Sequence, residues 1–218
     1  MNFETARKNM VDGQLAPNKI TDIRLLKAFL DVPREAFVDV SLKNVAYTDE
    51  TLEIGQGRKM MKPMIAASII QEMDIQPEDK VLVCASGSGY MAAVIAKLTP
   101  SVYAIEPSAG LWEMSRRAMG DAKCKTVKME KGDYAQGLQG EAPFDKILIN
   151  APVATVPEKV LSQLKNGGTI VYMKEGEALD GLCDVVLCTK KGRKLEEKHV
   201  MQTAGDTIDA EASTPFTF

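Results

Sequence analysis

The segment from Lys80 to Leu98 limits the possible folds of this chain more than any other part of it. It starts with the apolar run Val81–Cys84, continues with the loop Ala85–Gly89 and ends in a helical pattern over residues 90–98. A short run without polar side chains is typical of a parallel strand buried on both faces, and such a strand is commonly followed by a glycine loop and a helix. The chain is therefore predicted to contain a parallel α/β sheet.

The rest of the chain repeats this alternation. Helical patterns cover residues 111–119 and 157–164, and strand patterns cover residues 102–106, 125–130, 144–150 and 169–173. This order predicts parallel strands joined by right-handed crossovers. Two further strand patterns, 183–189 and 194–201, flank a short turn that contains Gly192. A turn this short joins antiparallel neighbours, so the sheet is expected to end in a hairpin.

Two regions are predicted, packed as one compact unit: a helical cap over residues 1–55 and a sheet domain over residues 56–218. In the cap, Thr21 or Asp22 can begin a helix that stops at Val32–Pro33. Its apolar face is predicted to consist of Ile23, Leu26, Phe29 and Leu30. Residues 54–63 are predicted to form a loop with two glycines, which ends at a proline suited to the first turn of a helix reaching about Met73.

Composition and charge exclude several classes of partner. The 218 residues include 27 basic and 30 acidic side chains, so the net charge of −3 leaves no cationic excess to bind nucleic acid. The apolar run at residues 64–70 is too short to cross a bilayer, and residues 1–10 lack the apolar core of a signal peptide. We expect a cytoplasmic protein. The pattern fixes no oligomeric state, and the tail from Gly205 to Phe218 is equally suited to docking on the core or projecting from it.

The histidine and cysteine content limits the kinds of catalytic or metal site that this chain can form. A single histidine, His199, and the absence of a Cys-x-x-Cys pair argue against a metal site and against a histidine-based triad. Four cysteines lie in or beside apolar runs, so we expect them to be small buried side chains in a reducing compartment: Cys84, Cys124, Cys183 and Cys188.

The carboxyl ends of the predicted strands are where a ligand is expected. Open α/β sheets bind ligands there, usually against the first strand-to-helix loop, here residues 85–89. Glu106 ends the next strand, 19 residues after Gly87, a distance at which a carboxylate can accept from both hydroxyls of an adenosine ribose. Alternatively, Glu106 caps the helix that begins near Pro107. Gly132–Asp133 can meet an adenine ring or form an ordinary turn, and Asn150 can bind substrate or close a turn before Pro152.

The order of these segments resembles the protein-L-isoaspartate O-methyltransferase family, whose members use S-adenosylmethionine (SAM) to methylate the free carboxyl group of isoaspartyl residues in damaged proteins. The runs PREAFV (residues 33–38) and GSGYMAAV (residues 87–94) are the most specific parts of the resemblance, which covers residues from about 5 to 173. The other matching pieces are Ala46–Tyr47, Ile54–Gly57 with Lys62–Pro63, Ile105–Glu106, Gly132–Asp133, Val156–Pro157 and Gln163–Gly168.

The resemblance implies a Rossmann-like, seven-stranded methyltransferase sheet that is mostly parallel, with an antiparallel last strand and helices on both faces. It also implies SAM as cofactor and a protein or peptide carboxylate as substrate. The residues expected to bind the cofactor are Ala85, Ser86, Gly87, Ser88, Gly89, Tyr90, Glu106, Pro107, Gly132, Asp133 and Asn150.

Three positions depart from the family pattern. The glycine loop usually begins with an acidic residue and an additional glycine, where this chain has Val83 and Ala85. Without the acidic group, the cationic methionine end of SAM loses a contact worth about 1 to 3 kcal/mol, and Ala85 places a methyl group where the backbone can need a positive φ. The family also places a serine hydroxyl beside the reacting carboxylate. This chain has Met61 there, which cannot donate a hydrogen bond.

Methyl transfer to a carboxylate needs no strong base, because the carboxylate is already ionised at neutral pH and alignment supplies most of the rate. The candidate catalytic positions are Met61, at the family's serine position, and the cations Arg58 and Lys59. Together with Lys62, these cations can attract an anionic substrate or can simply be solvated side chains of a surface loop.

Three functions from different classes remain open at this point. The first is an active SAM-dependent carboxyl O-methyltransferase. The second is a degenerate relative that has lost isoaspartyl activity and serves as a binding module or acts on another acceptor. The third is a nicotinamide oxidoreductase, because Gly87-x-Gly89-x-x-Ala92 also fits the dinucleotide pattern, although the C-terminal hairpin argues against it. If the loop is a weakened SAM site, the double change Val83→Glu with Ala85→Gly should raise cofactor affinity.

Overall fold

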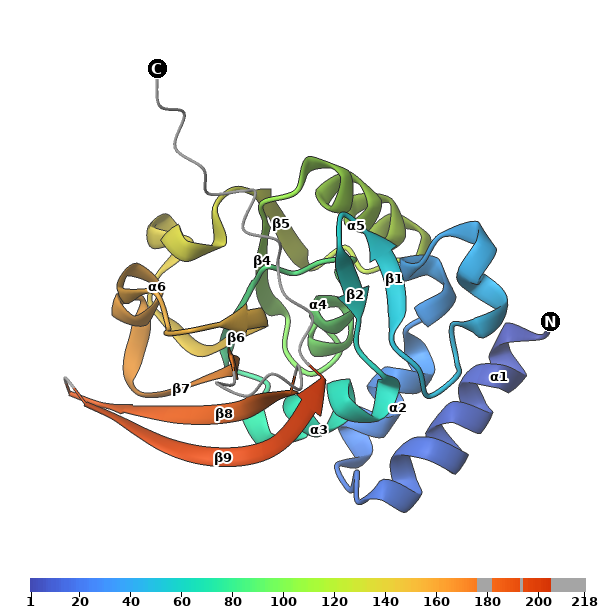
Figure 1. The fold of residues 1–218 in the computed structure, drawn as a ribbon, viewed down its shortest axis with the longest axis horizontal. Coiled ribbons are helices and arrows are strands. Elements are labelled where there is room, and N and C mark those ends of the chain that lie inside the picture. Colours follow the sequence, from blue (N-terminus) through green and yellow to red (C-terminus); the bar gives the residue numbers. More distant parts are fainter. Residues whose placement is uncertain (176–181, 193, 205–218) are drawn as a thin grey trace.

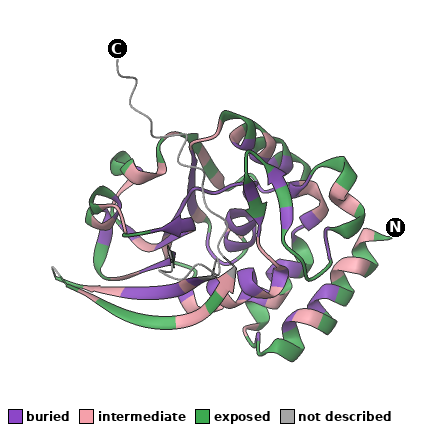
Figure 2. Ribbon diagram, viewed as in Figure 1, coloured by how far each residue is buried: buried purple, intermediate pink, exposed green. Residues whose placement is uncertain are grey.

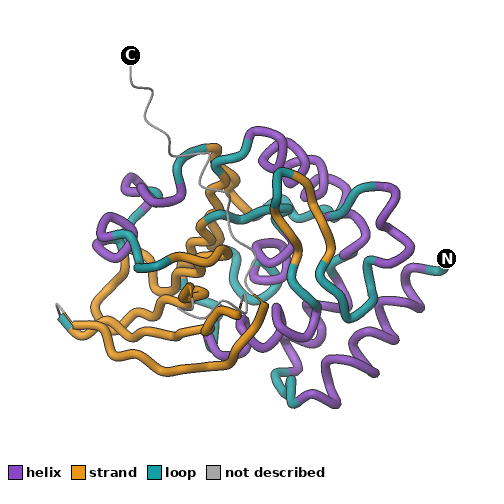
Figure 3. Tube along the Cα trace, in the orientation of Figure 1, coloured by secondary structure: helices purple, strands orange, loops and turns teal. Residues whose placement is uncertain are grey.

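A seven-stranded sheet forms the centre of the computed structural model, which describes residues 1–175, 182–192 and 194–204 (Figures 1 and 3). Its strand order is β5-β4-β3-β6-β7-β8-β9. The strands are β3 (Lys80–Cys84), β4 (Ser101–Glu106), β5 (Val127–Lys131), β6 (Phe144–Val153), β7 (Leu164–Glu175), β8 (Leu182–Lys191) and β9 (Lys194–Ala204).

Strand directions agree with the sequence prediction. The pairs from β5 across to β7 are parallel, and β8 pairs antiparallel with both β7 and β9. Because β4 and β5 lie on one side of β3 and β6 and β7 on the other, the winding of the sheet reverses between β3 and β6. A ligand is therefore expected outside the carboxyl ends of β3 and β6.

Strand β3 shows why an apolar run was the decisive signal. Val81 and Val83 belong to one core cluster, whereas Leu82 and Cys84 belong to the other, as the two-residue period of a strand requires. All four side chains are buried, because β3 has helices over both faces and a strand on each side. Figure 2 shows the buried residues concentrated in the central strands of the sheet and in the helix faces turned toward them.

The helices divide between the two faces. Helices α1 (Phe3–Met10), α2 (Ile23–Asp31), α3 (Pro63–Met73), α4 (Tyr90–Ile95) and α5 (Ala109–Asp121) contribute to the first cluster, and α6 (Glu158–Ser162) contributes to the second. The predicted helix over 157–164 is shorter than expected because Leu164 already pairs with Phe144 as the first residue of β7.

Helix α2 begins where predicted, but its buried face only overlaps the predicted one. Asp22 is its N-cap and accepts from the backbone N–H groups of Arg24 and Leu25. The predicted apolar face is right in part: Phe29 is buried and Leu26 is partly buried against the core, but Ile23 is 80% exposed and Leu30 is 38% exposed. Leu25 and Ala28, which were not predicted, are buried. Both sets have helical spacing, and packing against the rest of the cap and α4 decides between them.

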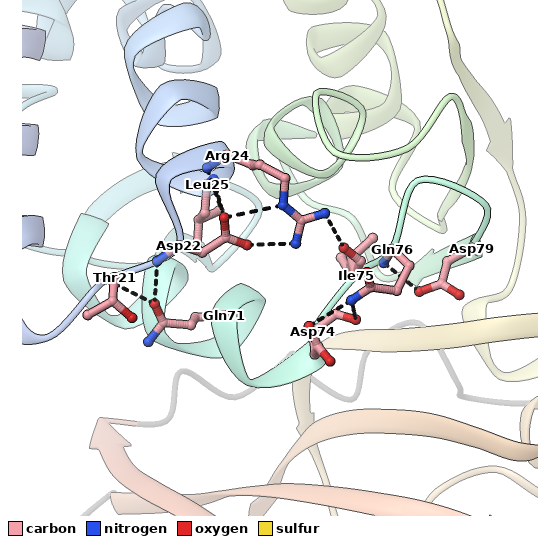
Figure 4. Close-up of polar contacts among 9 residues, drawn as sticks. All are labelled: Thr21, Asp22, Arg24, Leu25, Gln71, Asp74, Ile75, Gln76 and Asp79. Atoms are coloured by element: carbon pink, nitrogen blue, oxygen red, sulfur yellow. Dashed lines mark hydrogen bonds and ion pairs between the residues drawn. The ribbon is translucent and has the colours of Figure 1, made fainter.

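The N-terminal region is joined to the sheet domain by a polar network around the start of α2 (Figure 4). Gln71 of α3 accepts from the backbone N–H groups of Thr21 at 2.7 Å and Asp22 at 3.3 Å. Arg24 donates to the carbonyl of Ile75 at 3.2 Å. The first core cluster also contains residues of both regions. The division into regions 1–55 and 56–218 stays a prediction.

The predicted loop at 54–63 is in part a hairpin, of β1 (Leu52–Gly55) and β2 (Arg58–Met60), separate from the large sheet (Figure 1). Its turn residues Gln56 and Gly57 have φ values of 58° and 67°, a combination that matches the twist of two antiparallel strands. Burial alternates along both strands, so Arg58 and Met60 face inward while Lys59 faces outward. Helix α3 then begins at Pro63, as predicted.

Several smaller expectations can be checked. All four cysteines are buried as reduced thiols. His199 lies on β9 with Nε2 3.2 Å from the Asp184 carboxylate, far along the sheet from the glycine loop. None of the helices in the described part of the chain is long and apolar enough to span a membrane. The C-terminal tail, residues 205–218, lies outside the described residues.

Candidate functional site

The loop after β3 adopts the backbone conformation that its glycines allow. Gly87 and Gly89 have φ values of 60° and 84°, and Gly89 is the N-cap of α4. Ala85 has a φ of 53°, so the predicted departure is real: a side chain occupies a left-handed position that favours glycine. Backbone hydrogen bonds from Ser86 to the carbonyl of Ile105 and from Gly89 to the carbonyl of Ser86 hold this shape.

Glu106 connects this loop to the one after β4. Its Oε2 accepts from the backbone N–H of Gly87 at 2.7 Å, and its Oε1 accepts from the N–H of Ser108 at 3.0 Å. The side chain is 0% exposed. Burial raises the pKa of Glu106, while the Arg58 charge and the two N–H donors oppose that rise. The N-cap of α5 is Ser108, so the alternative prediction that Glu106 caps this helix is not needed to explain its position.

Arg58 of the hairpin reaches into the same place. Its Nη2 donates to the carbonyl oxygen of Ala85 at 2.8 Å and to that of Asn150 at 3.1 Å, and its Nη1 lies 3.8 Å from Oε1 of Glu106. The residue is only 6% exposed, and burial lowers its pKa against the opposing effect of Glu106. Arg58 is therefore not a solvated surface cation. It bridges β3 and β6 where the winding of the sheet reverses.

Three other residues predicted to bind the cofactor, Gly132, Asp133 and Asn150, lie in loops or strands near Glu106 and Gly87. Gly132 follows β5 and donates its N–H to the carbonyl of Glu106, which brings the two loops together. Asp133 caps a short 3-10 helix through its side chain, as the turn interpretation predicted. The Asn150 amide nitrogen lies 3.8 Å from the position that a Cβ on Gly87 would take.

An open pocket of about 330 Å³ lies beside the glycine loop, on the side of β6. Its floor is apolar, from Met61, Met64, Ile65, Pro152 and Met173. Ala151 and polar or charged residues of β2, β6, β9 and nearby loops complete the lining. The polar and charged residues are Asp49, Thr51, Arg58, Lys59, Lys62, Asn150, Gln202 and Thr203. Arg58 lines this pocket and also donates to the carbonyl of Ala85 in the glycine loop. The cations and apolar side chains of the lining make the pocket suited to an anionic group with an apolar body.

Comparison with known proteins identifies the fold and the family. Residues 5–204 match the model of the protein-L-isoaspartate(D-aspartate) O-methyltransferase (PCMT) family. The chain belongs to this family. Relatives include protein-L-isoaspartate O-methyltransferase 1 of Syntrophobacter fumaroxidans, 37% identical over 78% of this chain and 80% of the relative. The protein-L-isoaspartate O-methyltransferase of Methylorubrum extorquens is 42% identical over 76% of this chain and 72% of the relative.

Solved structures support the same fold. A protein-L-isoaspartate O-methyltransferase aligns with a TM-score of 0.82 over 92% of this chain and 65% of its own, at 24% identity. A PCMT from Plasmodium falciparum, solved with S-adenosyl-L-homocysteine, aligns with a TM-score of 0.78 over 96% and 99%, at 18% identity. Family membership favours neither the degenerate interpretation nor the nicotinamide one.

The residues of this PCMT member fit the adenosine and methionine parts of SAM in three respects. Gly87 offers a surface without a Cβ, Glu106 keeps lone pairs beyond its two backbone donors, and the buried Ser86 hydroxyl has no hydrogen-bond partner. An orphaned hydroxyl at the tip of the central strand indicates a polar partner that the protein itself does not provide. Among the described residues, Ile54 and the Arg58 guanidinium lie nearest to the open surface of Gly87.

Sequence reasoning missed Arg34 as a site residue of this PCMT chain. Arg34 is fully buried and donates to the carbonyls of Ala46 at 2.7 Å and Met61 at 2.6 Å, so it fixes the backbone at the family's serine position. Its guanidinium lies 4.9 Å from the ring centroid of Tyr90. Tyr90 therefore packs into the cap, also against Phe29 and Phe37. The one available signal was the position of Arg34 inside the PREAFV run that matches the family.

Proposed function

We propose that this protein transfers the methyl group of SAM to the free carboxylate of isoaspartyl residues in proteins or peptides. The observation that carries the proposal is the Glu106 carboxylate, held by Gly87 and Ser108 at the reversal point of a sheet whose chain belongs to the PCMT family. The relatives that match it are named for this activity. We also propose that the protein is cytoplasmic. The site would lie mainly within residues 56–218, with Asp49 and Thr51 of the cap (residues 1–55) adding to the pocket lining.

The cofactor would be held by the glycine loop and the two loops beside it. Glu106 would accept from the ribose hydroxyls, with Pro107, Gly132 and Asp133 nearby. The loop from Ala85 to Gly89 and the backbone of Tyr90 would face the methionine part. SAM supplies a methyl group on a positively charged sulfur, which an ionised carboxylate can attack directly. The protein's contribution is to align the two reactants and to exclude water.

The acceptor would enter the pocket beside β6. Lys59 and Lys62 lie at its rim, with their ammonium groups 3.7 Å from Glu53 and 4.0 Å from Glu50. These exposed ion pairs are weak, so an incoming carboxylate can displace them at little cost. Met61 lies in the pocket wall without a hydroxyl to offer, and Asn150 is the neutral side chain best placed to donate to the acceptor.

The test is transfer of labelled methyl from SAM to an isoaspartyl peptide beside its normal aspartyl counterpart. We expect label in the isoaspartyl peptide, in a base-labile ester. Equal labelling of both peptides, or of neither while SAM binds, would refute the proposed acceptor.

Cofactor binding is tested separately by calorimetry. Glu106→Gln is expected to weaken SAM at least tenfold, because a neutral amide accepts less strongly from the ribose hydroxyls. Glu113→Gln, an exposed change of the same chemistry on α5, is the control. Loss of affinity in both variants, or in neither, would count against the role of Glu106.

A further inference from the structure

Arg58 is the one charged side chain among the described residues whose hydrogen bonds join the two strand ends at the reversal point. The carbonyls of Ala85 and Asn150 and the carboxylate of Glu106 make this crevice electronegative, and the guanidinium is the positive charge that fills it. The arrangement is that of a cation-binding site whose occupant comes from the protein itself.

The hairpin places this occupant directly on the surface that a cofactor would cover. A Cβ on Gly87 would lie 3.7 Å from Nη2 of Arg58 and 3.2 Å from Cδ1 of Ile54. Glu106, the residue that would hold the ribose, is fully buried with Arg58 beside it. A ligand can therefore reach the loop and the carboxylate only if the Arg58 side chain leaves.

Charge makes the two occupants exclusive. SAM carries a sulfonium cation, and two cations in a crevice with little water repel each other more strongly than they would in solvent. The departure at Val83 removes a negative charge that would otherwise attract the cofactor, since that side chain is apolar and fully buried. In this chain, therefore, one attraction fewer is available to draw the SAM cation into the site against the Arg58 charge.

We propose that Arg58 is an internal competitor of the cofactor: its guanidinium occupies the cationic part of the SAM site and must withdraw before SAM binds. This rests on the proposed function, because a competitor matters only if SAM enters the crevice. Arg58 then determines the SAM affinity of this chain, and its role is to oppose binding of the cofactor, not to hold the methyl acceptor.

The experiment is calorimetric titration of SAM and of S-adenosylhomocysteine into the wild type, Arg58→Gln and Arg117→Gln. The last variant makes the same chemical change on the exposed surface of α5, where Arg117 pairs only with Glu113 at 3.6 Å among the described residues. Arg58→Gln is expected to bind SAM at least tenfold more tightly, equivalent to about 1.4 kcal/mol. The gain for S-adenosylhomocysteine, whose sulfur is uncharged, is expected to be smaller. Arg117→Gln is expected to stay within twofold of the wild type.

Thermal unfolding without ligand gives a second readout. Arg58→Gln should melt at a lower temperature, because the carbonyls of Ala85 and Asn150 lose a charged donor. A purely structural arginine would lower the melting temperature without raising affinity, and that result would overturn the proposal. Weaker binding in Arg58→Gln would also overturn it, by showing that the guanidinium holds the ligand.

The failure of this proposal can be told from failure of the proposed function. If the wild type binds SAM and methylates the isoaspartyl peptide while Arg58→Gln binds no more tightly, only the competitor is refuted. If neither protein binds SAM at millimolar concentration, both proposals fall. Binding by Arg58→Gln alone would support both the cofactor site and the competitor.

Discussion

Replacing Gly89 by alanine should destabilise the protein by an amount that can be worked out from the structure. Gly89 has a φ of 84°, where an L-residue with a Cβ is strained by about 1 to 2 kcal/mol. The added Cβ would lie 2.9 Å from Cε of Met119 and 3.1 Å from Cβ of Ser115. The methionine end can move, but Ser115 is a buried residue in α5, so further strain of about 1 kcal/mol follows.

The expected total is a loss of about 2 to 3 kcal/mol in the free energy of unfolding. For a chain of this size that corresponds to a fall of roughly 5 to 10 °C in melting temperature. Urea unfolding followed by circular dichroism measures the free energy, and the slope with urea should be unchanged.

Gly120→Ala is the matched control. Gly120 lies in α5 with no atom within 4 Å of the position of its Cβ, so the same substitution should stabilise the protein by about 0.4 to 1 kcal/mol. The two variants are therefore expected to change stability in opposite directions. If Gly89→Ala were within 0.5 kcal/mol of the wild type, the claim that this backbone position requires glycine would be refuted.

Four further substitutions test the glycine loop and the sheet that carries it. Ala85→Gly should raise the free energy of unfolding by about 0.5 to 1 kcal/mol in a urea titration by relieving the φ of 53°, whereas Val83→Glu should lower it by burying an unpaired charge, so the two are best made separately. Ser86→Ala removes a buried hydroxyl without a partner and should raise the melting temperature while weakening SAM in calorimetry; unchanged SAM affinity would show that the hydroxyl does not face the cofactor. Burial alone would raise the pKa of Asp145, but hydrogen bonds from Lys165 and from the backbone N–H of Lys80 hold that pKa below the ordinary 3.8. The ionised Asp145 side chain therefore stabilises the folded state above pH 3.8, and this stabilisation is lost as the pH falls through the lowered pKa. The stability difference between wild type and Asp145→Asn should therefore shrink from pH 7 to pH 3, and a constant difference would contradict the assignment.

The sequence predicted only some of the contacts in the candidate site. Gly87 and Glu106 were predicted to lie at the same cofactor site, because their spacing along a strand–helix–strand unit fixes where the second strand ends. The structure also joins them by a hydrogen bond of 2.7 Å, which the sequence did not predict. Arg58 was predicted to face an acceptor or solvent, and it fills the crevice instead. No local pattern reports that contact, because Ala85 and Asn150 lie 27 and 92 residues away.

The sequence alone determined what depends on neighbours along the chain. The apolar run of β3, the glycines after it, the Asp22 cap and the turn between β8 and β9 each act within a few residues, so their signals survive in a linear pattern. Tertiary structure decided which stripe of α2 is buried, that residues 52–60 pair as a hairpin, and that Arg34 and Arg58 are buried. Those outcomes depend on which distant surfaces and carbonyl groups meet, and burial and hydrogen bonding are settled only when the chain is folded.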